Sequence, residues 1–190
     1  FSLLLFAFLS AGILMSALWQ GGVIKTFDFS LLISPQRTLL VSLAVIITIA
    51  GMVVVTYWHA QQYVAAIFYG NGINAFATTK DLDRSIKSLS IAVNLGSSQD
   101  RYHRTLSQVL LLKAGEVLRK KDLKPDELQT QFQVALQGSL EVARRATAVN
   151  PAEPQNWSQL ASIYENVMSV INGADGPAID AYKKASAGDP

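Results

Sequence analysis

The feature that most constrains this chain is a long stretch without charge. From Thr38 to Thr79 there is no Asp, Glu, Lys or Arg, and the part from Leu39 to Val55 reads LLVSLAVIITIAGMVVV. A helix rises about 1.5 Å per residue, so Leu39 to Trp58 covers roughly the 30 Å of a bilayer's hydrocarbon core. The sequence therefore predicts a transmembrane helix over residues 38–58, with the lipid bilayer as its partner.

A second apolar run, Phe1 to Trp19, also lacks charge. It predicts another transmembrane helix over residues 1–19, joined to the next by a loop over residues 20–37. The alternative is a signal peptide, but the run is longer than the usual apolar core of about 7–15 residues and shows no basic leader. The loop carries Lys25 and Arg37 against Asp28, and the next basic residue is Lys80. The positive-inside rule then places the loop in the cytoplasm and the rest of the chain outside.

The part from Lys80 onward has the composition of a soluble, nearly neutral domain. Only Lys25, Asp28 and Arg37 are charged before it, so 14 of the 16 basic and 13 of the 14 acidic residues lie here. The net charge of +2 and the lack of a basic face with interleaved aromatics argue against nucleic-acid binding. The chain has no cysteine, which excludes disulfides, thiolate metal sites and cysteine nucleophiles.

A spaced motif near the end of the chain predicts how this domain folds. It reads Trp157-x2-Leu160-Ala161-x2-Tyr164, then Ala178-x3-Tyr182-x2-Ala185, then Pro190. Large residues at helical spacing fill the gap between two antiparallel helices, small ones let the backbones approach, and proline ends the second helix. The motif resembles the tetratricopeptide repeat, which reads W-x2-L-G-x2-Y, then A-x3-F and then P.

The motif occurs twice more upstream in the same register. Tyr69 and His103 are 34 residues apart, the period of the family, whereas His103 and Trp157 are 54 apart. The middle unit therefore has 20 additional residues, which we place around Leu118–Gln137, where they lengthen both helices. The matching positions are Leu106, Ser107, Leu110, Ser139, Ala143, Ala146 and Pro151 in the middle unit, and Tyr69, Gly72, Phe76, Ser85, Leu89 and Ala92 in the first.

The predicted fold class is all-α, with two transmembrane helices followed by a tetratricopeptide-like α-solenoid of about three helix pairs. The solenoid occupies residues 59–190, in units of about 66–99, 100–153 and 154–190. We expect the second span to run with little break into the first repeat helix, Gln61–Phe76. Ser97-x2-Asp100 predicts a capping box before the next helix. His103 stands where the family prefers Trp, which predicts looser packing of that pair.

The sequence shows no catalytic or metal-binding motif. His59 and His103 are the only histidines; the first lies at the predicted membrane edge and the second replaces a packed aromatic. The H-E-x-x-H, P-loop and G-x-S-x-G patterns are absent. Asp122, Asp126 and Glu127 are better explained by a helix start, where the dipole favours negative charge, than by a metal cluster. We predict no catalytic residue, no cofactor and no metal in this chain.

A binding surface is predicted instead. In tetratricopeptide arrays, ligands usually lie in the concave groove that each unit's first helix lines. Carried over to the best-matched unit, the resemblance nominates a groove for a protein or peptide at Gln155, Ser158, Ser162, Glu165 and Asn166. The alternative is that these polar side chains only keep the surface soluble and that the stacked units are purely structural.

The order of two spans, an extended middle repeat and a turn containing Gly173-Ala174-Asp175 resembles a more specific family. It is similar to the carboxy-terminal part of bacterial O-antigen ligase or polymerase-like membrane proteins with tetratricopeptide tails. That resemblance implies the bacterial inner membrane, with the array outside the cytoplasm. It rests on the short strings Ser34-Pro35-Gln36-Arg37, Leu106-Ser107-Gln108-Val109 and Tyr164-Glu165-Asn166.

Two functions are compatible with these features. The first is a membrane-anchored scaffold that binds a protein through the array. The second is the tail of a polytopic glycan-transfer enzyme whose catalytic part lies upstream of Phe1. The chain lacks an initiator Met and stops at Gly188-Asp189-Pro190, so we expect a fragment of a longer protein. A transporter subunit would need polar residues inside the spans, which these spans lack.

Overall fold

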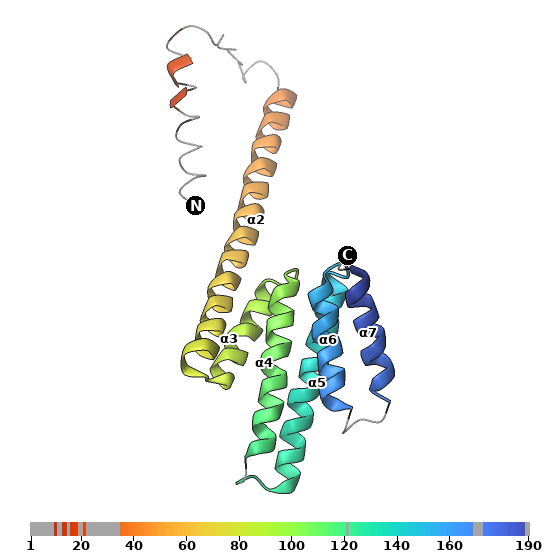
Figure 1. The fold of residues 1–190 in the computed structure, drawn as a ribbon. Coiled ribbons are helices and arrows are strands. Elements are labelled where there is room, and N and C mark those ends of the chain that lie inside the picture. Colours follow the sequence, from red (N-terminus) through yellow and green to blue (C-terminus); the bar gives the residue numbers. More distant parts are fainter. Residues whose placement is uncertain are drawn as a thin grey trace. The chain divides into compact units, whose positions relative to one another are not determined.

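The computed structural model describes residues 10, 13, 14, 16–18, 21, 35–120, 122–168 and 173–188. The predicted first span over residues 1–19 and most of the loop over residues 20–37 lie outside the described residues. The described part is all-helical, which confirms the all-α prediction (Figure 1). The chain divides into two compact units, Phe1–Met52 and Val53–Pro190, and the helical array belongs to the second.

Among the described residues, one helix is long and apolar enough to cross a membrane, over Thr38–Thr79. It comprises α2 (Pro35–Asn74) and the short π-helical segment η2 (Ala75–Thr79). All side chains from Leu39 to Ala60 are exposed in the structure. Apolar residues occur on every side of this helical segment rather than in one stripe. The helix continues unbroken past Gln61, so the absence of a break that we predicted between residue 58 and the segment Gln61–Phe76 is confirmed.

The chain reverses direction directly after η2. Lys80 adopts the left-handed conformation with φ of 53°, and both its N–H and that of Asp81 donate to the Ala75 carbonyl. Asp81 then caps the next helix, because its Oδ1 accepts the Arg84 N–H at 2.9 Å. A side chain in the left-handed region is strained, so this turn is held by its hydrogen bonds.

Three antiparallel helix pairs follow one another along the chain (Figure 1). They are the end of α2 with α3 (Leu82–Leu95), α4 (Asp100–Arg119) with α5 (Pro125–Val149), and α6 (Pro154–Val167) with α7 (Asp175–Gly188). α4 and α5 contain 20 and 25 residues, whereas α3, α6 and α7 contain 14 each. The additional residues of the middle unit therefore lengthen both helices about their turn, as predicted.

Gly72 lets α3 approach α2 closely. A Cβ built on Gly72 would lie 2.7 Å from Leu89 Cγ and 3.3 Å from Leu89 N, so a larger residue does not fit without a shift. At this short separation Ser85 Oγ donates to the Gly72 carbonyl at 2.9 Å. Ser85 and Leu89 are both fully buried, so the crossing point of this pair is closed to solvent.

The second helix pair makes a similar contact from the equivalent serine, but to a carbonyl one position further along its first helix. Ser139 Oγ on α5 donates to the Ser107 carbonyl on α4 at 2.8 Å, and both serines are fully buried. In the third pair the two positions hold Ala161 and Ala178, which are also buried. The position of Ser85, Ser139 and Ala178 therefore holds a small residue in every pair, and in the first two pairs its buried hydroxyl donates to a main-chain carbonyl.

In the second and third helix pairs, a ring N–H at the start of the first helix donates to a carbonyl of the preceding turn. Trp157 Nε1 donates to the Pro151 carbonyl at 2.8 Å, and His103 Nε2 donates to the Ser97 carbonyl at 3.0 Å, in both cases six residues earlier. His103 is only 3% exposed, so the predicted loosening at this position is not what the structure shows. Because a carbonyl only accepts, the His103 proton sits on Nε2, and the buried Nδ1 has no partner among the described residues.

The predicted capping box before α4 is wrong. The residue that precedes α4 is Gln99, its side chain makes no capping bond, and Asp100 already lies inside the helix. The turn is set by tertiary packing instead, because a Cβ on Gly96 would lie 2.9 Å from the Tyr102 ring. Asp100 uses its carboxylate elsewhere, on Asn156 of α6.

Asn156 joins the second and third helix pairs. It is fully buried, and its Nδ2 lies 2.9 Å from Asp100 Oδ2, 3.2 Å from the Ala146 carbonyl and 3.1 Å from the Asn150 carbonyl. Its Oδ1 accepts from Arg104 Nη1 at 2.8 Å. One carboxamide thereby meets groups of α4, α5 and the turn that follows α5, which satisfies a polar group that would otherwise be costly to bury.

Apolar packing forms two clusters, one around α3 and one around α6. Most residues nominated for repeat packing contribute to them or are buried beside them. Tyr182 is the exception: it is 42% exposed, because no described element packs against that side of α7. The nominated residues that are buried or partly buried are Tyr69, Gly72, Phe76, Leu106, Ser107, Leu110, Trp157, Leu160, Ala161, Tyr164, Ala178 and Ala185.

Candidate functional site

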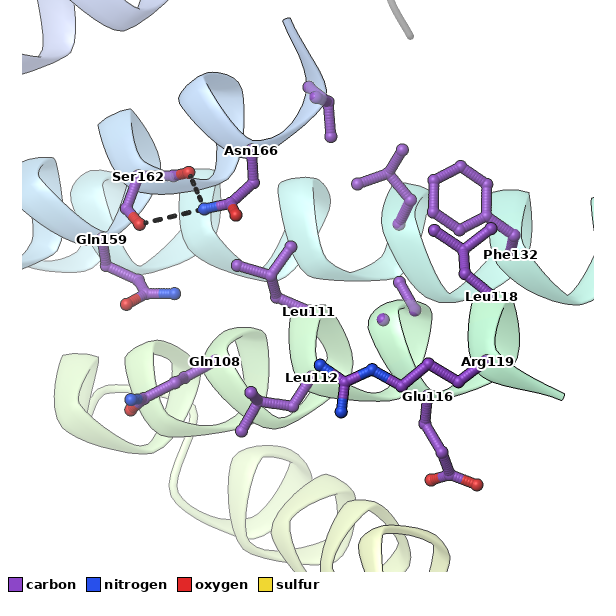
Figure 2. Close-up of a pocket in the computed structure, with 14 residues that line it drawn as sticks. Gln108, Leu111, Leu112, Glu116, Leu118, Arg119, Phe132, Gln159, Ser162 and Asn166 are labelled. Atoms are coloured by element: carbon purple, nitrogen blue, oxygen red, sulfur yellow. Dashed lines mark hydrogen bonds between the residues drawn. The ribbon is translucent and has the colours of Figure 1, made fainter. Parts of the chain in front are cut away.

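The described array contains a groove between α4, α5 and α6, with a volume of about 570 Å³ (Figure 2). α4 and α6, the first helices of their pairs, supply its two walls, and α5 supplies its floor. The lining residues are Gln108, Leu111, Leu112, Ala114, Gly115, Glu116, Leu118 and Arg119 from α4, Phe132 and Leu136 from α5, and Gln159, Ser162, Asn166 and Val167 from α6.

The groove exists because α4 is longer than α6. α4 has 20 residues and α6 has 14, a difference of six residues that corresponds to about 9 Å of helix. Beyond Val167 the described part of the third pair does not cover this end of α4 and α5, so Leu118 is exposed and Phe132 is only partly buried where they line the groove. The 20 additional residues of the middle unit therefore create the groove.

The walls combine an apolar surface with carboxamides. Leu112 lines the groove from α4 and is 43% exposed. Gln108 and Gln159 face the groove from α4 and α6 (Figure 2). Asn166 Nδ2 donates to the Ser162 carbonyl at 2.7 Å, which fixes its orientation at the end of α6. Carboxamides that flank apolar side chains can bond a peptide main chain while its side chains contact leucine.

Charge is distributed unevenly along α4. Lys113 Nζ lies 2.8 Å from Asp83 Oδ2 and 3.5 Å from Glu116 Oε1, and Lys120 lies 3.3 Å from the same Glu116 oxygen. Burial lowers the pKa of Lys113, but the hydrogen bond and charge of Asp83 outweigh this and raise it above its ordinary value of 10.5. Arg119 has no ion pair with any described carboxylate, and its side chain extends along α4 toward the groove (Figure 2).

The five nominated groove residues separate into two groups. Ser162 and Asn166 line the groove, and the structure brings them together with Gln159. Gln155 and Ser158 are exposed on α6 outside it. Glu165 is also exposed and is turned to α7 instead, where its Oε2 accepts the Tyr182 hydroxyl at 2.5 Å. The hydrogen bond to Glu165, together with partial burial and the charge of that carboxylate, raises the pKa of Tyr182 above its ordinary value of 10.0.

Sequence reasoning missed the α4 wall of the groove, although the repeat register contains the signal. His103 and Trp157 are equivalent and 54 residues apart, so Ser162 and Asn166 correspond to Gln108 and Leu112. Both of these residues line the groove. Applying the register to two units instead of one would have found both walls. The floor residues of α5 carry no such signal, because they lie in the additional segment.

The described residues offer no arrangement typical of metal binding or acid–base catalysis. No three His, Cys, Asp or Glu side chains in the described part lie together in a way that would hold a metal ion. His59 bonds to its own helix, where Nδ1 donates to the Val55 carbonyl at 2.8 Å. His103 is enclosed at the α3–α4 turn.

Comparison with known proteins leaves the relationship open. No protein-family model matches the chain, and no curated protein is similar to it at a significant level.

Proposed function

We propose that the chain is a membrane-anchored scaffold whose tetratricopeptide-like array binds a segment of another protein in the groove between α4 and α6. The scaffold performs no chemistry of its own. The observation that carries this proposal is the groove itself, which is lined by equivalent positions of two successive first helices and is open to solvent.

The repeat interpretation is supported by contacts that recur in register. Ser85 and Ser139 stand at the equivalent position of their second helices, and each donates from its hydroxyl to a carbonyl of the first helix. The ring N–H bond to the carbonyl six residues earlier occurs at the start of the second and third pairs. Contacts that recur with the sequence period are typical of a solenoid built from one repeated unit.

The anchor is supported by the charge-free helix over Thr38–Thr79. Because Lys25 and Arg37 lie in the predicted loop before it, the proposal places the array outside the cytoplasm. A protease-protection assay on sealed vesicles tests this side. Cleavage of the array in intact inside-out vesicles would contradict the outside placement, whereas protection there and cleavage in right-side-out vesicles would support it.

Site-specific photo-crosslinking in the native membrane tests the groove. A benzophenone amino acid replaces Leu112, which lies in the groove, and in a matched chain it replaces Val134, which is exposed on α5 outside it. We expect one defined crosslinked protein from position 112 and none from position 134. Asn166→Trp, which fills the groove, should abolish the product, and Ser158→Trp, on the exposed side of α6, should not.

The proposal fails if positions 112 and 134 give the same products, because the contact would then be non-specific. It also fails if the product from position 112 survives Asn166→Trp, because the partner would then lie outside the groove. Circular dichroism of each variant shows whether the helices are retained.

A further inference from the structure

The first repeat helix has one packed side and one uncovered side. Ala65, Phe68 and Tyr69 of α2 pack against α3 and α4. On the opposite side Tyr63 is 71% exposed and Ile67 is 47% exposed, with Val64 between them. No described element covers this side of α2. A solenoid normally ends in a polar outer face, so an apolar outer face requires an occupant.

The polar groups of the same segment are already satisfied within the helix. Gln61 Nε2 donates to the Tyr57 hydroxyl at 2.9 Å, and His59 Nδ1 donates to the Val55 carbonyl at 2.8 Å. Trp58 and Tyr57 are exposed beside them. Exposed aromatic rings with internally bonded polar groups suit the boundary between hydrocarbon and headgroups, where rings are enriched and water is scarce.

We propose that the side of α2 formed by Tyr63 and Val64 lies in the headgroup region of the bilayer, with Ile67 at its outer edge, and that the exposed rings of Tyr57 and Trp58 mark the inner boundary of this region. This inference depends on the proposed membrane anchor. We assign lipid to the uncovered side of α2 because this side is continuous with the charge-free helix that the anchor requires.

The lengths agree with this placement. If the hydrocarbon core ends near Trp58, Tyr63 lies five residues further, about 7.5 Å along the axis. The headgroup region on one side of a bilayer is about 5–8 Å thick, so Tyr63 falls at its outer part and Ile67 just beyond it. Gly96 lies at the level of Ala65, because a Cβ built on Gly96 would be 3.2 Å from Ala65 Cβ.

The absence of cysteine makes a direct test possible in the full chain. A nitroxide spin label is attached to single cysteines introduced as Val54→Cys, Tyr63→Cys, Ile67→Cys and Thr78→Cys, and the protein is placed in nanodiscs of phosphatidylcholine and phosphatidylglycerol. Collision with oxygen reports lipid, and collision with a water-soluble nickel chelate reports water. We expect position 54 to favour oxygen, position 78 to favour nickel, and positions 63 and 67 to lie between them, with position 63 nearer to position 54.

Each other outcome is decisive. If position 54 favours oxygen but position 63 favours nickel as strongly as position 78 does, the anchor stands and the headgroup contact is wrong. If position 63 is immobilised and shielded from both probes, protein covers this side and the lipid assignment is overturned. If position 54 itself favours nickel, the proposed anchor fails, and the present inference falls with it. Tyr63 and Thr78 are exposed, so these labels leave the packing of the array intact.

Discussion

Alanine at Gly72 tests the packing of the first helix pair most directly. The new Cβ would meet Leu89 Cγ at 2.7 Å and the Leu89 main-chain nitrogen at 3.3 Å. The Cγ atom is the branch point of a fully buried side chain, so it has little room to move. Gly70 provides the matched control, because it lies in the same helix and a Cβ there meets nothing within 4 Å.

The two variants separate helix propensity from packing. Alanine in place of glycine stabilises a helix interior by about 0.8–1.0 kcal/mol, and this gain is common to both positions. Overpacking a tight contact costs roughly 1–3 kcal/mol, and only Gly72→Ala has that cost. We therefore expect Gly70→Ala to stabilise the pair and Gly72→Ala to be less stable than Gly70→Ala by about 1–3 kcal/mol.

Hydrogen exchange of the α3 amides measures this difference in the full chain in nanodiscs. A difference of 1–3 kcal/mol corresponds to exchange that is roughly 5- to 140-fold faster in Gly72→Ala than in Gly70→Ala. Equal exchange in the two variants would refute the reasoning, because it would mean that α2 and α3 are not in close contact at Gly72. The double variant with Leu89→Ala should lose less stability than the sum of the single variants, because it removes the clashing side chain.

Three further outcomes follow from the described contacts. Lys80→Gly should stabilise the chain by roughly 0.5–1 kcal/mol in thermal melts, since glycine adopts the positive φ of 53° without strain; a lower melting temperature would contradict this. His103→Phe should cost about 1–3 kcal/mol in urea unfolding, because the Ser97 carbonyl loses its donor. The raised pKa of Tyr182 means that its bond to Glu165 contributes stability below pH 10 and is lost as the pH rises through the folded-state value. Absorbance titration of the phenol should show a lower pKa for Tyr182 in Glu165→Gln, and an unchanged value would exclude the bond.

The helices themselves were predictable because their apolar positions are periodic. Leu82, Ile86 and Leu89 recur at helical spacing, and α3 buries or half-buries all three. The 34-residue step from Tyr69 to His103 also predicts where the second pair begins. Periodicity reports which residues face a neighbouring helix, so it locates the helix pairs well.

Features that depend on contacts between distant segments were less predictable. The capping box at Ser97 failed because a local pattern was outweighed by the packing of Gly96 on Tyr102. The groove was found only in part, since its depth results from the unequal lengths of α4 and α6. Glu165 was nominated from its place on α6, but its bond to Tyr182 depends on how α7 folds back. No pattern within one helix carries that information.

The buried carboxamide of Asn156 has a consequence for how the third helix pair docks. Two apolar helix faces can slide past each other by one turn, about 5.4 Å, and still bury a similar area. Asn156 removes that freedom, because a shift of one turn would strip it of Asp100, Arg104 and the Ala146 carbonyl together and leave a fully buried carboxamide without these partners. We therefore expect α6 to have a single register against α4 and α5. The width of the groove would then be a fixed property of the array, so that a partner must match it.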